Sequence, residues 1–237
     1  MPAKAKPMQP IVALKALKTL INDPEQTEQV FVIIRAMSGN HLEKSYARFR
    51  QTISGVRILR EERQLLDVLQ NREFLLSLPA DSLGRHYLHF VETEQITADG
   101  LVEASQNDEQ MIDDPGLLLF SERLRDMHDL WHVVTGYGRD TFGEACLLAF
   151  TYAQTRNRGV GIIALVGMEK IAREIGPDVR PAMWQGYKAG KAASWLPAAD
   201  WEHLLTQPIE AVRTELSIRP PVKYRQIFDQ QPIANAA

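Results

Sequence analysis

The apolar residues of this chain recur at intervals of three and four nearly throughout, and extended runs of period-two alternation are absent. Such spacing places the apolar side chains on one face of an α-helix. A half-buried strand needs strict alternation instead, because successive side chains point to opposite faces of a sheet. The sequence therefore predicts an all-α fold, with one helix formed around Val30, Ile33, Ile34 and Met37.

Helix boundaries are marked by capping residues. An Asp followed by Pro predicts a helix start, because Asp caps the first free N–H groups and Pro fits the first helical position. These signals occur at Asp23-Pro24-Glu25 and at Asp114-Pro115, where the second leads into a segment that continues through His132. Asp200 and Pro208 are expected to open two shorter helices, whereas Ser38-Gly39-Asn40 ends one and His41 begins the next.

No internal linker divides the chain. Residues 1–10 and 220–237 are polar and Pro-rich, so loose order is expected there. The expected organisation is an N-terminal extension over 1–19, a single helical domain over 20–218 and a C-terminal tail over 219–237.

Composition excludes several classes of protein. Lys and Arg number 27 against 30 Asp and Glu, so the basic excess of a nucleic-acid-binding protein is missing. Cys146 is the single cysteine, which excludes an internal disulfide and a site built from several thiolates. No window reaches 18 apolar residues, so no membrane-spanning helix is expected. The first ten residues resemble neither a secretory signal nor a mitochondrial presequence.

Potential metal ligands are concentrated in one segment. His128 and His132 are four residues apart, which on a helix places their Cβ atoms about 5–6 Å from each other on one face. Asp129 falls within the same arc, about 100° from His128. Gly136 and Gly138 permit a sharp turn, after which a second helix near residue 140 could bring Glu144 back to the same ion.

Two imidazoles and two carboxylates balance the charge of one divalent cation. Nitrogen and oxygen ligands without sulfur suit zinc, iron(II), manganese or cobalt, and the ligand types do not choose among them. If Asp129 binds only weakly, the set approaches two His and one carboxylate, with open positions for oxygen or substrate.

Three other interpretations of these residues stay open. The two histidines could be polar residues on a solvated helix face. Thr141 and Glu144 also match a capping box, in which the Glu side chain only holds a backbone N–H. His128-Asp129 could belong to an HD-type phosphohydrolase, although no spacing identifies the further His and Asp that such an enzyme needs.

The complete motif, His-Asp-x-x-His followed after eleven residues by Glu, resembles the signature of the coenzyme Q (ubiquinone) biosynthesis protein 4 family. It extends from His128 to Glu144 without a departure. Flanking segments of residues 20–218 are also similar to the family, namely Leu78-Pro79-Ala80-Asp81-Ser82-Leu83-Gly84-Arg85-x-Tyr87, Asp129-Leu130-Trp131-His132-Val133-x-Thr135-Gly136, Trp184-x-x-Gly186-Tyr187-Lys188-x-Gly190-Lys191 and Asp200-Trp201-Glu202.

The resemblance implies an all-helical, commonly dimeric protein with an apolar cavity for an isoprenoid tail and a metal site between two helices. It implies a role in ubiquinone biosynthesis beside the other proteins of that pathway, with a polyprenylated quinone precursor as ligand. The implied activity is oxidative decarboxylation, in which the carboxyl group on ring carbon 1 of a polyprenylated benzoate is replaced by hydroxyl. The alternative is a non-catalytic, lipid-binding scaffold that organises the pathway's complex.

Because a presequence is missing, the chain resembles a bacterial member, expected in the cytoplasm and peripherally on the inner membrane. In the catalytic hypothesis His128, His132 and Glu144 are ligands, and Asp129 is either a fourth ligand or a carboxylate that handles protons.

Two further segments are candidates for binding the substrate. The apolar run Val160–Met168, with Ile163 and Val166, could form a wall of the lipid site, although a plain core helix is the simpler interpretation. Arg85 could hold an anionic headgroup, with Gly84 allowing close backbone approach and Tyr87 adding a hydroxyl. A surface Arg is the simpler interpretation of Arg85.

Overall fold

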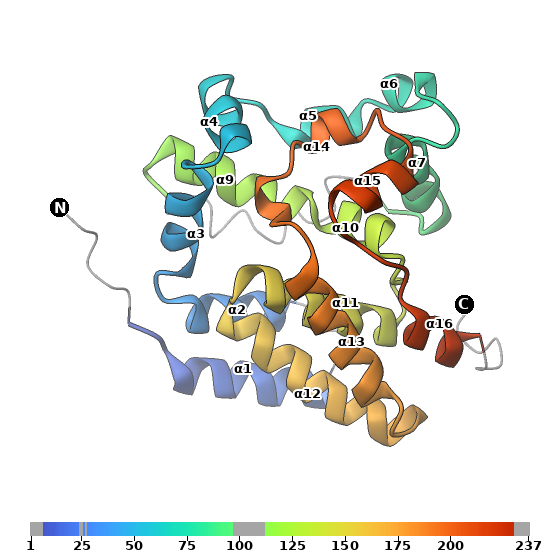
Figure 1. Ribbon diagram of the computed structural model, residues 1–237. Coiled ribbons are helices and arrows are strands. Elements are labelled where there is room, and N and C mark those ends of the chain that lie inside the picture. Colours follow the sequence, from blue (N-terminus) through green and yellow to red (C-terminus); the bar gives the residue numbers. More distant parts are fainter. Residues whose placement is uncertain (1–6, 24–25, 27, 97–111, 230–237) are drawn as a thin grey trace.

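The computed structural model describes residues 7–23, 26, 28–96 and 112–229, and within them the protein is helical without a strand (Figure 1). The all-α prediction is therefore confirmed. The elements are α1 (Pro10–Asn22), α2 (Glu28–Ser38), α3 (His41–Phe49), α4 (Ile53–Arg60), α5 (Leu65–Gln70), α6 (Arg72–Ser77), α7 (Leu83–Thr93), α9 (Pro115–Asp126), α10 (His128–Thr135), α11 (Thr141–Thr155), α12 (Arg158–Ile175), α13 (Val179–Ala192), the 3-10 helix η1 (Leu196–Ala198), α14 (Trp201–Leu204), α15 (Ile209–Glu215) and α16 (Val222–Phe228).

Helix α11 lies at the centre of the molecule and packs against α12 and α13 (Figure 1). Helix α2 covers α12, and α1 covers α2 at the outer edge. On the other side of α11, helix α10 lies between α7, α9 and α15. The largest cluster of buried apolar residues draws its members from helices on both sides of α11. It includes Leu130, Trp131, Phe150 and Trp201. The two helices that carry the candidate ligands, α10 and α11, are thus central elements of the core.

The capping signals locate most helix starts correctly. Asp114 caps α9 by accepting hydrogen bonds from the N–H groups of Gly116 and Leu117, as predicted. The segment that continues from there to His132 is two helices, with Met127 as the boundary residue between α9 and α10. This boundary was not predicted, since Met127 is neither Pro nor Gly.

Two other expected boundaries differ from the structure. Asp23 terminates α1 through its N–H bond to the carbonyl of Thr19, and α2 begins at Glu28. Pro24 and Glu25, which completed the predicted start signal, lie outside the described residues. Asp200 precedes α14 as expected but makes no side-chain cap, because its carboxylate pairs with Arg57 and Arg63 instead.

The ends of the chain are more structured than their composition indicated. Helix α1 crosses the expected domain boundary at residue 20 and packs on α2 through Ala13 and Ala16. Helix α16 lies within the expected tail, where Tyr224 is buried against α11 and α13. The expectation of loose order is therefore wrong for residues 222–228, because one apolar face of this short segment joins the core.

The expected apolar cavity is not seen in the described part of the chain. Ile163 is buried in a small cluster with residues of α1 and α2, and Val166 is half-buried on the same helix, α12. One cleft among the described residues has a volume of about 510 Å³ and is open to solvent. It is lined by polar groups, namely Arg57, Glu61, Arg63, Asp200, Glu202 and His203.

Candidate metal centre

The turn between α10 and α11 sets the direction of the second ligand helix. Gly136 ends α10 in the left-handed region, with φ of 77°, which a residue without a Cβ adopts at little cost. Arg213 of α15 donates to the carbonyls of Val133 and Val134, at 3.1 and 2.9 Å. These contacts satisfy carbonyls of the last turn, which has no further helical N–H groups to bond. The predicted turn at the glycines is confirmed.

Helix α11 begins with a cap that α16 reinforces. Asp140 accepts hydrogen bonds from the N–H groups of Phe142 and Gly143, at 3.1 and 3.0 Å. The Tyr224 hydroxyl of α16 donates to the other carboxylate oxygen of Asp140 and accepts from the N–H of Gly138 at 3.1 Å. One phenol therefore ties both sides of the turn together and fixes the first turn of α11, on which the candidate ligand Glu144 lies.

Replacing Tyr224 with phenylalanine is expected to lower the free energy of unfolding by about 1–2 kcal/mol, because the change leaves the Gly138 N–H and an Asp140 oxygen without their shared partner. The ring packing against Tyr137 and Phe142 is retained. Urea unfolding followed by circular dichroism measures the change. Tyr152→Phe is the matched control, since Tyr152 lies on α11 away from this turn, and an equal loss in both variants would contradict the assigned role.

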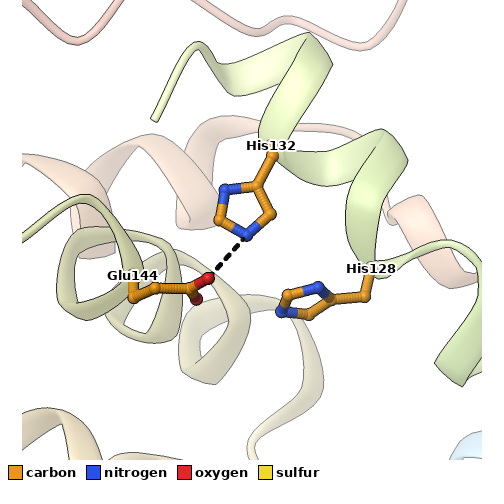
Figure 2. A group of neighbouring side chains, drawn as sticks. All are labelled: His128, His132 and Glu144. Carbon is orange, nitrogen blue, oxygen red and sulfur yellow. Dashed lines mark ion pairs between the residues drawn. The ribbon is translucent and has the colours of Figure 1, made fainter. Parts of the chain in front are cut away.

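The structure brings three of the four predicted ligands close together. One ligand atom from each of His128, His132 and Glu144 lies within 4.8 Å of the others, with the imidazoles on α10 and the carboxylate on α11 (Figure 2). The rings of His128 and His132 approach edge to face, with their centroids 4.9 Å apart. Asp129 is not part of this group. The structure thus contains a set of two nitrogens and one carboxylate that could hold one divalent ion.

His132 is held with one nitrogen free. Its Nδ1 lies 3.1 Å from the carbonyl oxygen of Tyr137, which can only accept, so Nδ1 carries the proton. The Nε2 atom is buried and forms no hydrogen bond, although it lies 3.3 Å from Oε1 of Glu144. Phe90 of α7 stacks on the ring at 5.6 Å. When Nε2 is unprotonated, its lone pair faces the carboxylate oxygen of Glu144, and a divalent metal ion shared by the two atoms fits this arrangement.

His128 has a similar arrangement with a carboxylate in place of the carbonyl. Its Nδ1 lies 3.3 Å from Oδ1 of Asp129, which leaves Nε2 available on the other side of the ring. Burial lowers the pKa of His128, but Asp129 and Glu144 outweigh it and raise the pKa above its usual value. The structure thus places Asp129 against His128 and keeps it out of the three-residue group.

Glu144 is ionised and faces the two histidines. Burial raises its pKa, but His132, His128 and Arg139 more than compensate, so the pKa lies below its usual value. The capping-box interpretation of Thr141 and Glu144 is wrong, because Asp140 caps α11 and the Glu144 carboxylate is directed at His132. The interpretation of the histidines as a solvated helix face fails for His132, whose side chain is fully buried.

The segment of α7 that was expected to hold a headgroup is buried at Gly84 and Tyr87 and half-buried at Arg85. A Cβ added at Gly84 would collide with the side chain of Leu78. Arg85 donates to the carbonyl of Leu76 at 2.8 Å. Tyr87 is buried, and burial together with the nearby Asp129 carboxylate raises the pKa of its hydroxyl. Of these three residues, Tyr87 is the one that lies toward the metal centre.

Other expectations for single residues are confirmed. Trp131 and Cys146 are buried in the core, where burial raises the pKa of the thiol well above its usual range. His86 and His89 are exposed on α7 and lie outside the ligand group.

Sequence reasoning missed four residues that support the site, and no signal in the sequence identified their role. They act through contacts between distant segments, and they are Phe90, Tyr137, Arg213 and Tyr224.

Comparison with known proteins identifies one family. A family model described as "Coenzyme Q (ubiquinone) biosynthesis protein Coq4" matches residues 3–222. Among curated relatives, the mitochondrial ubiquinone biosynthesis protein COQ4 of Podospora anserina is 28% identical over 181 residues, which cover 73% of this chain and 56% of that protein. The corresponding protein of Aspergillus clavatus is 30% identical over 176 residues, which cover 73% of this chain and 60% of its own length. The chain therefore spans somewhat more than half the length of these relatives.

A solved structure shares the fold. A crystal structure of a Nostoc punctiforme protein, provisionally described as a ubiquinone biosynthesis protein, superposes with a TM-score of 0.60 at 20% identity. The match covers 88% of this chain and 98% of that one. None of the helices described here is long and apolar enough to cross a membrane.

Proposed function

Because this chain belongs to the Coq4 family of coenzyme Q (ubiquinone) biosynthesis proteins, we propose that it carries out a metal-dependent step of that pathway, the oxidative decarboxylation of a polyprenylated benzoate. The observation that carries the proposal is the convergence of His128, His132 and Glu144, in which the buried Nε2 of His132 has no hydrogen-bond partner. A divalent ion bound there would satisfy that nitrogen and the facing Glu144 carboxylate together.

The net reaction replaces the ring carboxyl group by hydroxyl and releases carbon dioxide. One oxygen atom is added to the ring. With dioxygen as its source, the reaction also consumes two electrons from a donor and two protons, and the second oxygen atom leaves as water. A divalent ion held by His128, His132 and Glu144 would supply Lewis-acid stabilisation of the charge that develops on substrate oxygens and, if redox-active, a means of using dioxygen. Zinc, iron(II), manganese and cobalt all suit this set of ligand atoms.

The protein groups around these ligands have separate tasks. The Tyr137 carbonyl and the Asp129 carboxylate fix the Nδ1 protons of the two histidines, which directs both Nε2 atoms away from these partners. Phe90 limits the rotation of the His132 ring and covers one of its faces. His128 and Glu144 are only partly buried, so a substrate can approach from their side.

Asp129 is proposed to orient His128 rather than to bind the ion. The variant Asp129→Asn, in which the amide oxygen can still accept from Nδ1, is therefore expected to keep metal binding with an affinity reduced by about 10-fold, and Asp129→Ala by up to about 100-fold. Isothermal titration with zinc measures both affinities. The visible spectrum of the cobalt-loaded protein supplies a second readout, because a change in ligand number alters its intensity, and a changed spectrum in Asp129→Asn would contradict the orienting role.

The experiment that tests the function is a lipid extraction from cells that lack this protein and are rescued with His132→Ala. A rescue with His89→Ala, which changes an exposed histidine of α7, is the matched control. Both variants must accumulate to wild-type levels. We expect mass spectrometry to show that ubiquinone stays absent with His132→Ala and that a precursor bearing its ring carboxylate accumulates, while the control restores ubiquinone.

The alternative is a non-catalytic scaffold that binds a quinone precursor or another isoprenoid lipid beside other ubiquinone biosynthesis proteins. It predicts normal ubiquinone in cells rescued with His132→Ala, since a scaffold does not depend on a free ligand nitrogen. That outcome would overturn the enzymatic proposal.

A further inference from the structure

Helix α1 has two faces of different character. Its inner face packs on α2 through Ala13 and Ala16, which are 5% and 4% exposed, and through the partly buried Leu17 and Leu20. These small and aliphatic residues explain how α1 adheres to the fold. The opposite face contacts no other described element and lies at the outer edge of the molecule (Figure 1).

That opposite face is apolar and basic. Ile11, Leu14 and Ile21 are 71%, 67% and 46% exposed, although each is a large aliphatic side chain. Spacings of three, four and three residues place Ile11, Leu14, Lys18 and Ile21 within an arc of about 80°. Lys15 is exposed beside them, and α1 contains no acidic residue although the chain as a whole carries a net charge of −3. We call Ile11, Leu14, Lys15, Lys18 and Ile21 the outer face of α1.

A second copy of the protein is a poor occupant for this face. A helix of 13 residues is about 20 Å long and about 10 Å wide, so the face amounts to about 200 Å². A stable protein interface takes about 800 Å² from each partner. Pairing of two copies would also bring the lysines of one helix against those of the other, which costs free energy.

The surface of a lipid bilayer can bind both the aliphatic and the lysine side chains of the outer face of α1. Aliphatic side chains enter the boundary between headgroups and acyl chains, while lysine stems lie along it with their ammonium groups at the phosphates. Each lysine near an anionic leaflet contributes about 1 kcal/mol of attraction. A helix about 20 Å long lies along such a surface, because it is too short to cross a hydrocarbon core of about 30 Å.

We propose that the outer face of α1 docks the protein on the surface of membranes that contain anionic phospholipids. The inference extends the proposed function, whose substrate carries a lipid tail, by naming the surface through which the protein reaches that lipid phase. It depends on α1 alone and not on the metal centre.

The test is co-flotation of the full-length protein with vesicles of phosphatidylcholine, with or without phosphatidylglycerol. We expect binding to the anionic vesicles that weakens as salt is raised. Lys15→Glu with Lys18→Glu should lower the apparent affinity at least about tenfold, since it removes two attractive charges and adds two repulsive ones. Ile11→Ser with Leu14→Ser should lower it similarly.

The matched control is Ile53→Ser with Val56→Ser on α4. These two aliphatic residues are 94% and 53% exposed and lie beside Arg57 and Arg60, but Arg57 pairs with Asp200 and Arg60 with Glu61, so the basic charge beside them is neutralised. This control should bind as the wild type does. Circular dichroism confirms folding of each variant, and the lysine variant keeps the test informative if the apolar variant fails to fold.

Absence of binding by the wild-type protein, or an equal loss in the α4 control, would overturn the proposal. It would also be overturned if Leu14→Ser converts a dimer into a monomer in light scattering, because a second copy would then cover the face. The result is separable from that of the lipid extraction, since His132→Ala should bind vesicles normally whether or not it supports ubiquinone synthesis.

Discussion

His132→Ala is expected to lower the affinity of the protein for zinc by more than about 100-fold. Loss of a residue that only orients a metal ligand lowers affinity by up to about 100-fold, and loss of a ligand should cost more. The substitution removes the Nε2 atom that lies 3.3 Å from Glu144 and leaves His128 and Glu144 as the remaining pair. Two ligands cannot enclose an ion as three do. Equilibrium dialysis against a chelating buffer, followed by elemental analysis, measures the retained metal.

The control for this experiment is His89→Ala, because His89 is an exposed histidine on α7 outside the ligand group. It should retain metal as the wild type does. Both variants must show wild-type helicity. Metal retention by folded His132→Ala at the wild-type level would show that the ion binds elsewhere, and the three-residue site would have to be abandoned.

The second large effect is expected at a buried ion pair that is not part of the ligand group. The side chain of Arg123 is 1% exposed and binds Glu202 through two hydrogen bonds, of 2.5 and 2.9 Å. It also donates to the carbonyl of Arg63 at 2.9 Å. Arg123→Met is expected to lower the free energy of unfolding by about 3–5 kcal/mol, because it removes both hydrogen bonds to the Glu202 carboxylate and leaves it only the longer contact with Arg63, at 3.9 Å. Urea unfolding measures the loss.

Arg180→Met is the matched control, since Arg180 pairs with Glu169 at 2.8 Å on the exposed surface. Exposed pairs contribute little to stability, so this variant should unfold at nearly the wild-type urea concentration. The prediction would be contradicted if Arg123→Met lost no more free energy of unfolding than Arg180→Met does. Water would then replace Arg123 as the partner of Glu202 without a loss of stability.

The same pair gives stability a dependence on pH. Burial raises the pKa of Glu202, but Arg123 and Arg63 outweigh it and hold the pKa below its usual value. The folded protein therefore binds the proton more weakly than the unfolded chain does. The stabilisation is present above the unfolded pKa of about 4.3 and is lost as pH falls through the lower, folded value. In Arg123→Met this part of the acid dependence should become smaller, because Arg123 is the main group that lowers the pKa of Glu202.

Local sequence was sufficient for the parts of the site that depend on one helix or one turn. The spacing of His128 and His132 determined that both face the same side, and Gly136 marked the turn that returns the chain toward Glu144. Asp129 shows the limit of this reasoning. Helical rotation places it in the same arc as the histidines, but only the packed structure shows its carboxylate against Nδ1 of His128.

Contacts between distant segments could not be predicted from one sequence. Nothing in the order of residues shows that Phe90 stacks on His132 or that Arg213 binds the carbonyls that end α10. Asp200 has the composition of a helix cap, yet arginines of other segments compete successfully for its carboxylate. Such competition is decided by tertiary packing, in which a charged partner outweighs a backbone N–H.

The link between Tyr224 and Asp140 also has a consequence for how the protein matures. The two residues are separated by 84 positions, and the turn that they hold places Glu144. Synthesis proceeds from the N-terminus, so the histidines and the glutamate leave the ribosome well before the phenol that orders their geometry. A nascent chain therefore carries the candidate ligands before the clamp exists, and the geometry of the turn that places Glu144 is complete only after α16 has docked.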